Sequence, residues 1–411
     1  MKKIILCIAL LFPHVAQAIF PIDYLRPYND NLFRPVTYAQ TWSLDAIIEH
    51  SFNPEGHTEA GCEVNFLQIC QPTQSSLAMV KGFDSNSEIG MLSQQFTIND
   101  DDGVRGHFEP CADFDLNSAL ISGRYYFPQG FNIVASLPVY SLKISDVTWV
   151  EQTKSAVAAD FLVKELLTDD IDAKLAELGC LTIRNFEDTS VGDFYLGMQW
   201  MRDFPQFKEW IKNVRLNIYG GMTFPTASEC TLNDALAIPF GNDGAFGILF
   251  GGGIDLTLGC HVRAGVDTMF LNLFGSSQER RIKTFDSQTD LFLLQTALVR
   301  KEFGFTQRYN MYLELFGLGG LSVKAAYQHM RHNDDKLTAF SYCYSDLIAN
   351  TACSLREWTL HDFYFFVNFD SGYLYPDAAW QPFVSLWYKL PHAGHHSIGT
   401  HGVGGTIWFN Y

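Results

Sequence analysis

The chain ends on the stretch Val403-Gly-Gly-Thr-Ile-Trp-Phe-Asn-Tyr411, and this stretch decides the fold. Its bulky apolar or aromatic side chains recur at odd positions, which are Val403, Ile407, Phe409 and Tyr411. A period of two is the period of a β-strand, because successive side chains of a strand point to opposite faces. The stretch therefore predicts a strand that runs to the last residue and ends on an aromatic side chain.

The beginning of the chain has the pattern of an export signal. Lys2 and Lys3 precede an apolar run, 4–12, that is too short to span a bilayer, and Ala16-Gln-Ala18 has the small-x-small pattern of a cleavage site. We therefore expect a signal peptide over 1–18, with a mature chain that starts at Ile19. The alternative is a buried first element of a folded domain.

A final strand with a terminal aromatic residue resembles the C-terminal assembly signal of bacterial outer-membrane barrels. The resemblance implies that the barrel-assembly machinery recognises the strand through Tyr411, and that outer-membrane lipid and lipopolysaccharide surround the folded protein. Hydrophobic residues make up 47% of the chain, yet no apolar run reaches the ~18 residues of a membrane helix. The 34 Phe and 18 Tyr suit two interfacial girdles on a barrel, although an aromatic-rich soluble core would use them equally well.

The charge of the chain argues against nucleic acid as a partner. The formal net charge is −17, and no basic stripe is visible in the sequence. Phosphate binding needs clustered lysine and arginine side chains. We therefore expect no nucleic-acid partner.

We predict an all-β fold, a transmembrane antiparallel up-and-down β-barrel of about 12 strands (roughly 12–14). Most of the predicted strands exceed the about 9–11 residues that a tilted membrane strand needs. They are 36–50, 112–127, 130–144, 189–203, 211–225, 246–259, 261–273, 285–300, 310–330, 358–369, 379–390 and 399–411.

The predicted connections follow the plan of a bacterial barrel over 36–411, after a proline-containing periplasmic lead-in at 19–35. If the mature N-terminus is periplasmic, 51–111, 145–188 and 331–357 are long extracellular loops, and the periplasmic turns are short, as such barrels require. Residues 155–179 have roughly helical spacing of apolar side chains and predict a helix, or two short ones, inserted in one extracellular loop.

The two faces of the predicted strands differ in polarity. In 361–369, four apolar side chains share one face: Phe363, Phe365, Val367 and Phe369. Polar side chains share the other face, as expected for a wall between lipid and a wet lumen. A soluble sandwich gives the same alternation, but only a closed sheet leaves no unpaired edge in lipid.

The same alternation places eleven charged residues in the lumen. Opposed charges that face a water-filled pore would select solutes; the alternative is that they pair and stiffen a narrow barrel wall. The predicted pore-lining residues are Asp45, Glu49, Arg124, Asp193, Arg215, Asp255, Arg263, Asp267, Lys324, Asp362 and Lys389.

Eight cysteines remain after cleavage of the signal peptide, and in an exported protein they are disulfide candidates. The pairings closest in sequence are Cys62 with Cys70 and Cys343 with Cys353. Spacing alone leaves the connectivity open. No C-x-x-C pair is present, so the cysteines do not predict a zinc site.

Other patterns do not predict a metal, a cofactor or an enzyme. His392, His395, His396 and His401 lie within ten residues but among glycines, so we favour a flexible turn over a metal site. The acidic run 99–103 lacks the spacing of a calcium loop, and we interpret it as a solvated turn. Neither G-x-S-x-G nor H-E-x-x-H occurs, and we expect no catalytic residues.

Two motifs carry a family resemblance. Ser190-Val-Gly-Asp-Phe194 and Gly220-Gly-Met-Thr-Phe-Pro225 resemble strand ends in outer-membrane channels for aromatic hydrocarbons and related hydrophobic compounds. Long-chain fatty-acid channels of that broad group have fourteen strands and an N-terminal hatch, for which the segment 19–35 is too short. The resemblance implies passive diffusion of small solutes, hydrophobic ones among them. The alternative is a structural or adhesive surface barrel whose disulfide-stapled loops bind a partner or host.

Overall fold

The computed structural model describes residues 22–28, 41–96, 101–228, 231–375 and 380–410. The predicted signal peptide, most of the lead-in at 19–35, Cys230 and Tyr411 lie outside these residues. Within the described part of the chain, no helix is long and apolar enough to cross a membrane.

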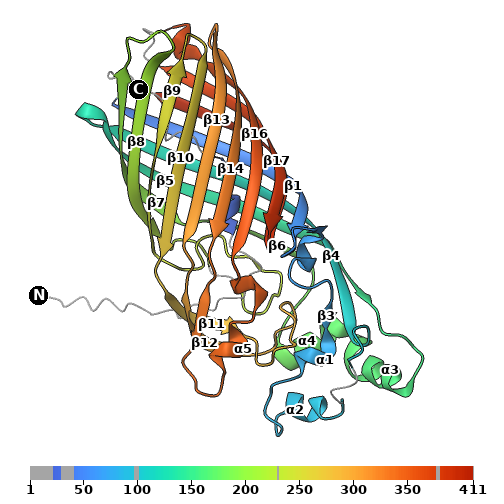
Figure 1. Cartoon of the computed structure of the whole chain (residues 1–411). Coiled ribbons are helices and arrows are strands. Elements are labelled where there is room, and N and C mark those ends of the chain that lie inside the picture. Colours follow the sequence, from blue (N-terminus) through green and yellow to red (C-terminus); the bar gives the residue numbers. More distant parts are fainter. Residues whose placement is uncertain (1–21, 29–40, 97–100, 229–230, 376–379, 411) are drawn as a thin grey trace, which may run out of the picture.

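A closed barrel of 12 antiparallel strands dominates the structure (Figure 1). Closure follows from β1, which pairs with β18 on one side and with β4 on the other. The barrel strands are β1 (Trp42–His57), β4 (His107–Tyr126), β5 (Phe131–Glu151), β7 (Phe194–Pro205), β8 (Ile211–Phe224), β9 (Gly247–Leu258), β10 (Val262–Leu273), β13 (Thr306–Leu318), β14 (Leu321–His332), β16 (Trp358–Asp370), β17 (Gln381–His395) and β18 (Ser397–Asn410). The predicted fold class is confirmed.

One predicted strand is wrong. Residues 285–300 do not cross the barrel, because the apolar run Leu291-Phe-Leu-Leu294 is buried among the connections at one barrel end, with Phe292 fully covered. An apolar run of this length is compatible with either environment.

A second segment contains two strands rather than one. The predicted strand 310–330 is divided between β13 and β14 by a tight turn at Gly319 and Gly320, whose φ angles are +65° and +90°. Only glycine adopts such angles readily. This turn also replaces the connection 301–309, which the sequence pattern places on the periplasmic side between the predicted strands 285–300 and 310–330. The two errors cancel, and the predicted number of strands is correct.

The long connections gather at one end of the barrel, the lower end in Figure 1, and fold into a compact unit that we call the cap. Its described residues are 58–96, 101–106, 152–193, 225–228, 231–246, 274–305 and 333–357. Its short strands are β2 (Glu63–Val64), β3 (Gln74–Ser75) and β6 (Phe186–Val191), which extend the barrel sheet, and β11 (Ser276–Arg281), β12 (Thr296–Glu302) and β15 (Lys336–Ala339), which form a separate sheet. Its helices are α1 (Ser76–Met79), α2 (Glu88–Ser93), α3 (Ala158–Val163), α4 (Ile171–Gly179) and α5 (Asp346–Ala349).

The predicted helical insertion is confirmed. α3 and α4 are joined through a π-helical turn at Lys164–Thr168, and the Asp170 carboxylate caps α4 by accepting from the Ala173 N–H. The inner face of this insertion, with Val163, Leu167 and Leu175, is buried in the cap core. The insertion is therefore part of the cap.

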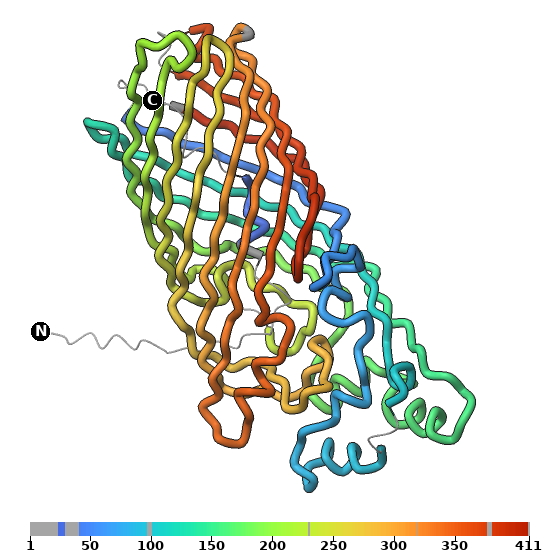
Figure 2. Tube along the Cα trace, in the orientation of Figure 1, coloured from blue at the N-terminus to red at the C-terminus, as the bar shows by residue number. Residues whose placement is uncertain are grey.

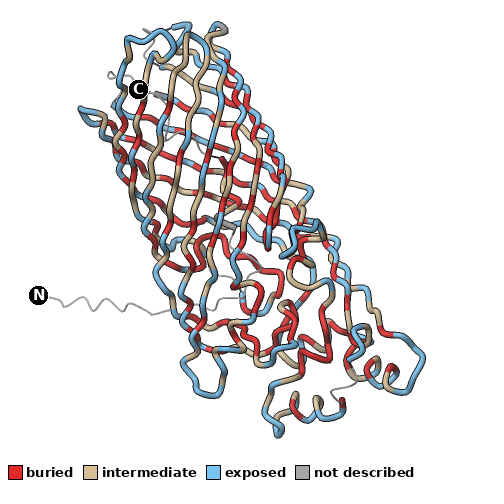
Figure 3. The backbone as a smooth tube through the Cα atoms, in the orientation of Figure 1, coloured by how far each residue is buried: buried red, intermediate tan, exposed pale blue. Residues whose placement is uncertain are grey.

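The outer surface of the barrel differs in polarity from that of the cap. Over residues 42–51 of β1 the exposed and buried side chains alternate strictly, and the exposed ones include Leu44 and Ile48. Figure 3 shows this alternation on many barrel strands. A continuous apolar outer surface is expected only where lipid covers it. The cap instead has its apolar side chains inside, as a water-soluble domain does.

Candidate functional site

Ten of the eleven predicted pore-lining residues are buried in the structure, each no more than 5% exposed. They are Asp45, Glu49, Arg124, Asp193, Arg215, Asp255, Asp267, Lys324, Asp362 and Lys389. Arg263 is partly buried, with 23% of its side chain exposed. Burial alternates with exposure along the strands that carry most of them. We therefore take the lumen as the candidate functional site.

Several of these charges are paired across the lumen wall. Lys389 lies 2.8 Å from the Glu49 carboxylate, which also accepts from the Trp387 indole at 3.1 Å. Lys389 is on β17 and Glu49 on β1, with β18 between them, so this ion pair crosses a whole strand. It joins two of the predicted pore-lining residues directly.

Other charges are held by partners that the sequence analysis did not identify. Arg215 makes two contacts with Asp203, at 2.9 and 3.2 Å, and Arg263 lies 3.0 Å from Glu314. Glu314 is not identified in the sequence analysis, because one strand is predicted over β13 and β14, and the alternation on β13 cannot be recognised within that single strand. A strand boundary at the Gly319-Gly320 pair would have placed it in the lumen.

Tyrosine hydroxyls donate to two of the buried carboxylates. The Tyr219 hydroxyl donates to Asp267 at 3.0 Å, and the Tyr312 hydroxyl donates to Asp255. The second carboxylate oxygen of Asp255 has no hydrogen-bond partner among the described residues, and the same holds for one oxygen of Asp362. Polar atoms of this kind suit a wall that faces water.

Asp193 has a different role from the strand residues. Its carboxylate accepts from the backbone N–H groups of Thr226, Ala227 and Asn242, at 3.2, 3.2 and 2.6 Å. Asp193 precedes β7 and thus fixes two cap connections at the barrel mouth. The two motifs of the family resemblance meet here, because Phe194 pairs with Phe224 in register.

The described part of the predicted periplasmic lead-in lies inside the barrel, which corrects that expectation. Tyr28 packs on Tyr364 and Phe366, with ring centroids 4.6 and 5.1 Å apart, and the Lys324 ammonium lies 5.0 Å from the Tyr28 ring. Tyr24 contacts Trp358 at 4.8 Å. Figure 2 shows this segment, 22–28, as the short dark-blue trace inside the barrel. We call it the lumen segment.

A small cavity of about 90 Å³ remains between the lumen segment and the wall. It has room for only a few water molecules. Arg26 and Arg308 contribute to its lining, and the Nε atom of Arg308 is buried without a hydrogen-bond partner among the described residues. The apolar part of the lining is Leu249, Met269, Leu271, Leu273, Phe303, Met330 and Trp358.

A disulfide joins two cap connections that are distant in sequence. Cys70 bonds to Cys353, 283 residues further along the chain, while Cys62 and Cys343 are free and exposed. The pairings closest in sequence are therefore wrong. Connectivity depends on which connections the closed barrel brings together at its rim.

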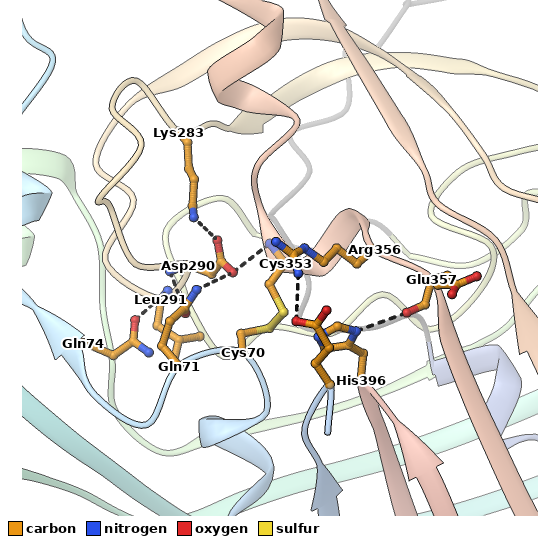
Figure 4. The surroundings of a disulfide bond; sticks show 11 residues. Cys70, Gln71, Gln74, Lys283, Asp290, Leu291, Cys353, Arg356, Glu357 and His396 are labelled. Atoms are coloured by element: carbon orange, nitrogen blue, oxygen red, sulfur yellow. Dashed lines mark hydrogen bonds and ion pairs between the residues drawn. A yellow bond between two sulfur atoms is a disulfide. The ribbon is translucent and has the colours of Figure 1, made fainter. Parts of the chain in front are cut away.

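Asp290 lies beside this disulfide (Figure 4). Its carboxylate accepts from the Cys353 N–H at 2.9 Å and from the Gln71 amide at 3.3 Å, and it pairs with Lys283 at 3.3 Å. Cys70, Asp290 and Cys353 form the one cluster with metal-ligand geometry found in the described residues, and its two sulfur atoms are bonded to each other.

Buried charges connect the cap sheet to the barrel. Asp243 accepts from Arg280 at 2.7 Å and lies 3.3 Å from Lys301, which is 2.8 Å from Asp335. His332, the last residue of β14, lies 2.9 Å from Asp335. Burial alone would raise the pKa of the Asp335 carboxyl, but Lys301 and His332 outweigh it and hold this pKa well below its usual range.

Arg281 fixes three cap connections at once. Its guanidinium donates to the backbone carbonyls of Leu232 at 2.6 Å, Leu293 at 2.8 Å, Leu294 at 3.1 Å and Gly179 at 2.9 Å. Burial lowers the pKa of Arg281 to about 10, so the side chain stays charged at neutral pH. The cap is thus one folded unit.

Comparisons with known proteins support the fold. No family model matches the chain, and no curated protein matches it. An outer-membrane channel of Pseudomonas putida F1 has a similar structure, with a TM-score of 0.51 and 11% identity over 93% of this chain and 99% of that chain. At this identity the likeness shows a shared fold.

Two further solved structures have lower scores. The toluene transporter TodX of Pseudomonas putida has a TM-score of 0.36 and 8% identity, over 92% of this chain and 90% of that chain. The porin NanC has a TM-score of 0.31 and 7% identity, over 72% and 93%. The predicted loose similarity to outer-membrane channels is confirmed at the level of the fold.

Proposed function

We propose that this chain is a channel of a bacterial outer membrane through which small solutes diffuse passively. The observation that carries the proposal is the closed barrel with apolar side chains outside and charged side chains inside. A lumen wall with buried carboxylates, guanidinium groups and tyrosine hydroxyls can orient a polar solute and water. The Pseudomonas putida F1 protein that shares this fold is described as an outer-membrane channel, and this supports a channel role for the present chain.

The proposal includes export and orientation. Residues 1–18 would direct secretion, Tyr411 would be read by the assembly machinery, and outer-membrane lipid and lipopolysaccharide would surround the barrel. The cap would be extracellular, because long connections face outward in bacterial barrels.

The apolar part of the cavity lining supports passage of hydrophobic solutes. Seven of the sixteen residues around the cavity are apolar: five leucines or methionines, Phe303 and Trp358. The lumen segment and the cap occupy part of the route, so we expect brief openings rather than a large steady current. Their displacement would be the gating step.

Single-channel recording tests the proposal. The detergent-extracted, folded protein in a planar bilayer should give discrete steps, and Arg263→Gln should change the cation-to-anion selectivity because it leaves Glu314 unpaired in the lumen. Arg300→Gln is the matched control, since Arg300 lies in the cap with 54% of its side chain exposed. A silent bilayer from inserted protein, with the lumen segment removed, would refute a channel.

A second candidate is an adhesive surface protein, and one observation favours it. The cap exposes Phe340, Tyr342 and Leu347, at 58%, 107% and 87%. Exposed apolar side chains on a folded unit are typical of interaction sites. Replacement of 340–347 by a short polar linker should leave conductance unchanged in a channel and should abolish partner binding in an adhesin.

A further inference from the structure

One sector of the outer barrel surface has a distinctive boundary towards the cap. On β14 the outward-facing side chains run from Leu321 through Val323 to Tyr327, and then change to His329 and Arg331. On β16 the outward apolar series ends at Phe363 and is followed by His361. Each histidine is flanked by buried, inward-facing neighbours along its strand.

Histidines also face outward on the next three strands around the barrel. The outward apolar series ends at His392 on β17 and at His401 on β18. On β1 His50 is followed outward by Phe52, which stacks on His50 and on His401 with ring centroids 5.7 and 6.1 Å apart. We call His329, His361, His392, His401 and His50 the histidine belt. On β4, the other neighbour of β1, the boundary differs, because its outward series ends on Asn117, opposite His50, and on Asp115.

Strand register brings the belt residues together. His329 is directly opposite His361, with ring centroids 4.5 Å apart, and Tyr309 of β13 stacks on His329 at 6.1 Å. His392 packs on Phe363 at 5.3 Å. Three histidines from three strands thus form a continuous patch just beyond the apolar surface.

Hydrogen bonding in the patch leaves the Nε2 atom of His361 for an external partner. The Tyr327 hydroxyl lies 2.6 Å from Nδ1 of His361, so when it donates there the Nε2–H of His361 is a donor. Nδ1 of His329 and the hydroxyl of Thr359 are buried with no hydrogen-bond partner among the described residues. Polar atoms without partners are costly next to hydrocarbon.

A permanent cation adjoins the same patch. Arg331 is directly opposite Thr359 in register, and its guanidinium contacts Glu357 at 2.8 Å. The two side chains are 47% and 55% exposed. An ion pair so exposed is weak, and a strong anion can compete with Glu357 for Arg331.

We propose that the patch of His329, His361, His392 and Arg331 binds the phosphate group of an anionic glycolipid in the outer leaflet. The proposal rests on the outer-membrane location given above. The patch lies where the apolar outer surface ends, which is the height of lipid headgroups. Imidazole and guanidinium N–H groups are suitable donors to phosphate oxygens, whereas β4 has Asn117 and Asp115 where its outward apolar series ends.

Lipid retention tests the proposal. The folded full-length mature protein is mixed with equal amounts of bisphosphorylated lipid A and its dephosphorylated form. Native mass spectrometry then measures how much of each lipid the protein retains. We expect about tenfold more phosphorylated lipid retained, the effect of one or two hydrogen bonds to a charged group. The double variant His329→Gln/His361→Gln should lose most of this preference, whereas His261→Gln, at the opposite barrel end, should behave as the parent.

The remaining arms separate the possible failures. Inorganic phosphate at millimolar concentration should not displace the lipid; displacement would show a generic anion site and overturn the proposal. Equal retention of the two lipids by the parent would also overturn it. Folding of each variant is checked by heat-modifiable gel mobility, and Arg331→Gln, outside the histidine pair, should give an intermediate loss. Failure of the proposed function would appear separately, as protein that does not insert into bilayers.

Discussion

Removal of the Cys70–Cys353 disulfide should loosen the cap without unfolding the barrel. With the barrel intact, the loop that this bond closes consists of the 13 residues 58–70 after β1 and the 5 residues 353–357 before β16. A closed loop of about 18 residues has a chain-entropy contribution of about 3 kcal/mol. The double variant Cys70→Ser/Cys353→Ser should therefore increase hydrogen exchange of cap amides by about a hundredfold.

The assay is residue-resolved hydrogen exchange of the protein in detergent, with the barrel amides as an internal reference. Cys62→Ser/Cys343→Ser is the matched control, because both thiols are free and exposed. Reduction of the parent protein should reproduce the effect of the double variant. The reasoning is refuted if the cap amides of the double variant stay as protected as those of the parent, since the rim would then hold the cap without the bond.

Three further outcomes are expected. The pKa of the Asp335 carboxyl is lower in the folded protein than in the unfolded chain, so its contribution to stability is complete above about pH 4 and is lost as the pH falls towards the folded pKa. Asp335→Asn should therefore lower the hydrogen-exchange protection of the cap at pH 7 and make that protection decline less in acid. An unchanged dependence of protection on acid pH would contradict this. Arg281→Met leaves four backbone carbonyls without their donor, and should cost the cap about 2–4 kcal/mol by the same exchange measurement. Tyr28→Ala removes two ring contacts and one cation–π contact of the lumen segment, which lowers the binding free energy of this segment in the lumen by roughly 2 kcal/mol. The variant should raise the open probability of the channel in planar bilayers, and an unchanged open probability would disprove this.

The barrel was predictable because its wall obeys a simple period. Strands such as β16 expose Phe365 and Val367 and bury Asp362 and Tyr364, and that alternation is visible in the sequence. The inward positions of the charged residues follow from the same period. The error at 285–300 arose where the period is absent, because Leu291 to Leu294 are packed in the cap and all four side chains are buried.

The contacts that occupy the lumen could not be predicted in this way. Tyr28 meets Tyr364 and Phe366 more than 300 positions away in the chain, and a short irregular segment has no period to show where it packs. The disulfide is a similar case, since Cys70 and Cys353 become neighbours only when β1 and β16 take their places in the closed sheet.

The inner wall of the barrel changes character along its length, and this change limits how a solute can pass. On β14 the inward side chains run from Lys324 through Gln328 to Met330, and on β16 from Asp362 to Leu360 and Trp358. Met330, Leu360 and Trp358 belong to the apolar core that the cap fills. A polar route along the lumen therefore ends at the cap core rather than at an open mouth. Either the cap rearranges, which the disulfide opposes, or a hydrophobic solute moves along this core, which a hydrated ion would avoid. Conductance and solute uptake should therefore respond unequally to the disulfide: its removal should raise ion current more than uptake of a hydrophobic solute.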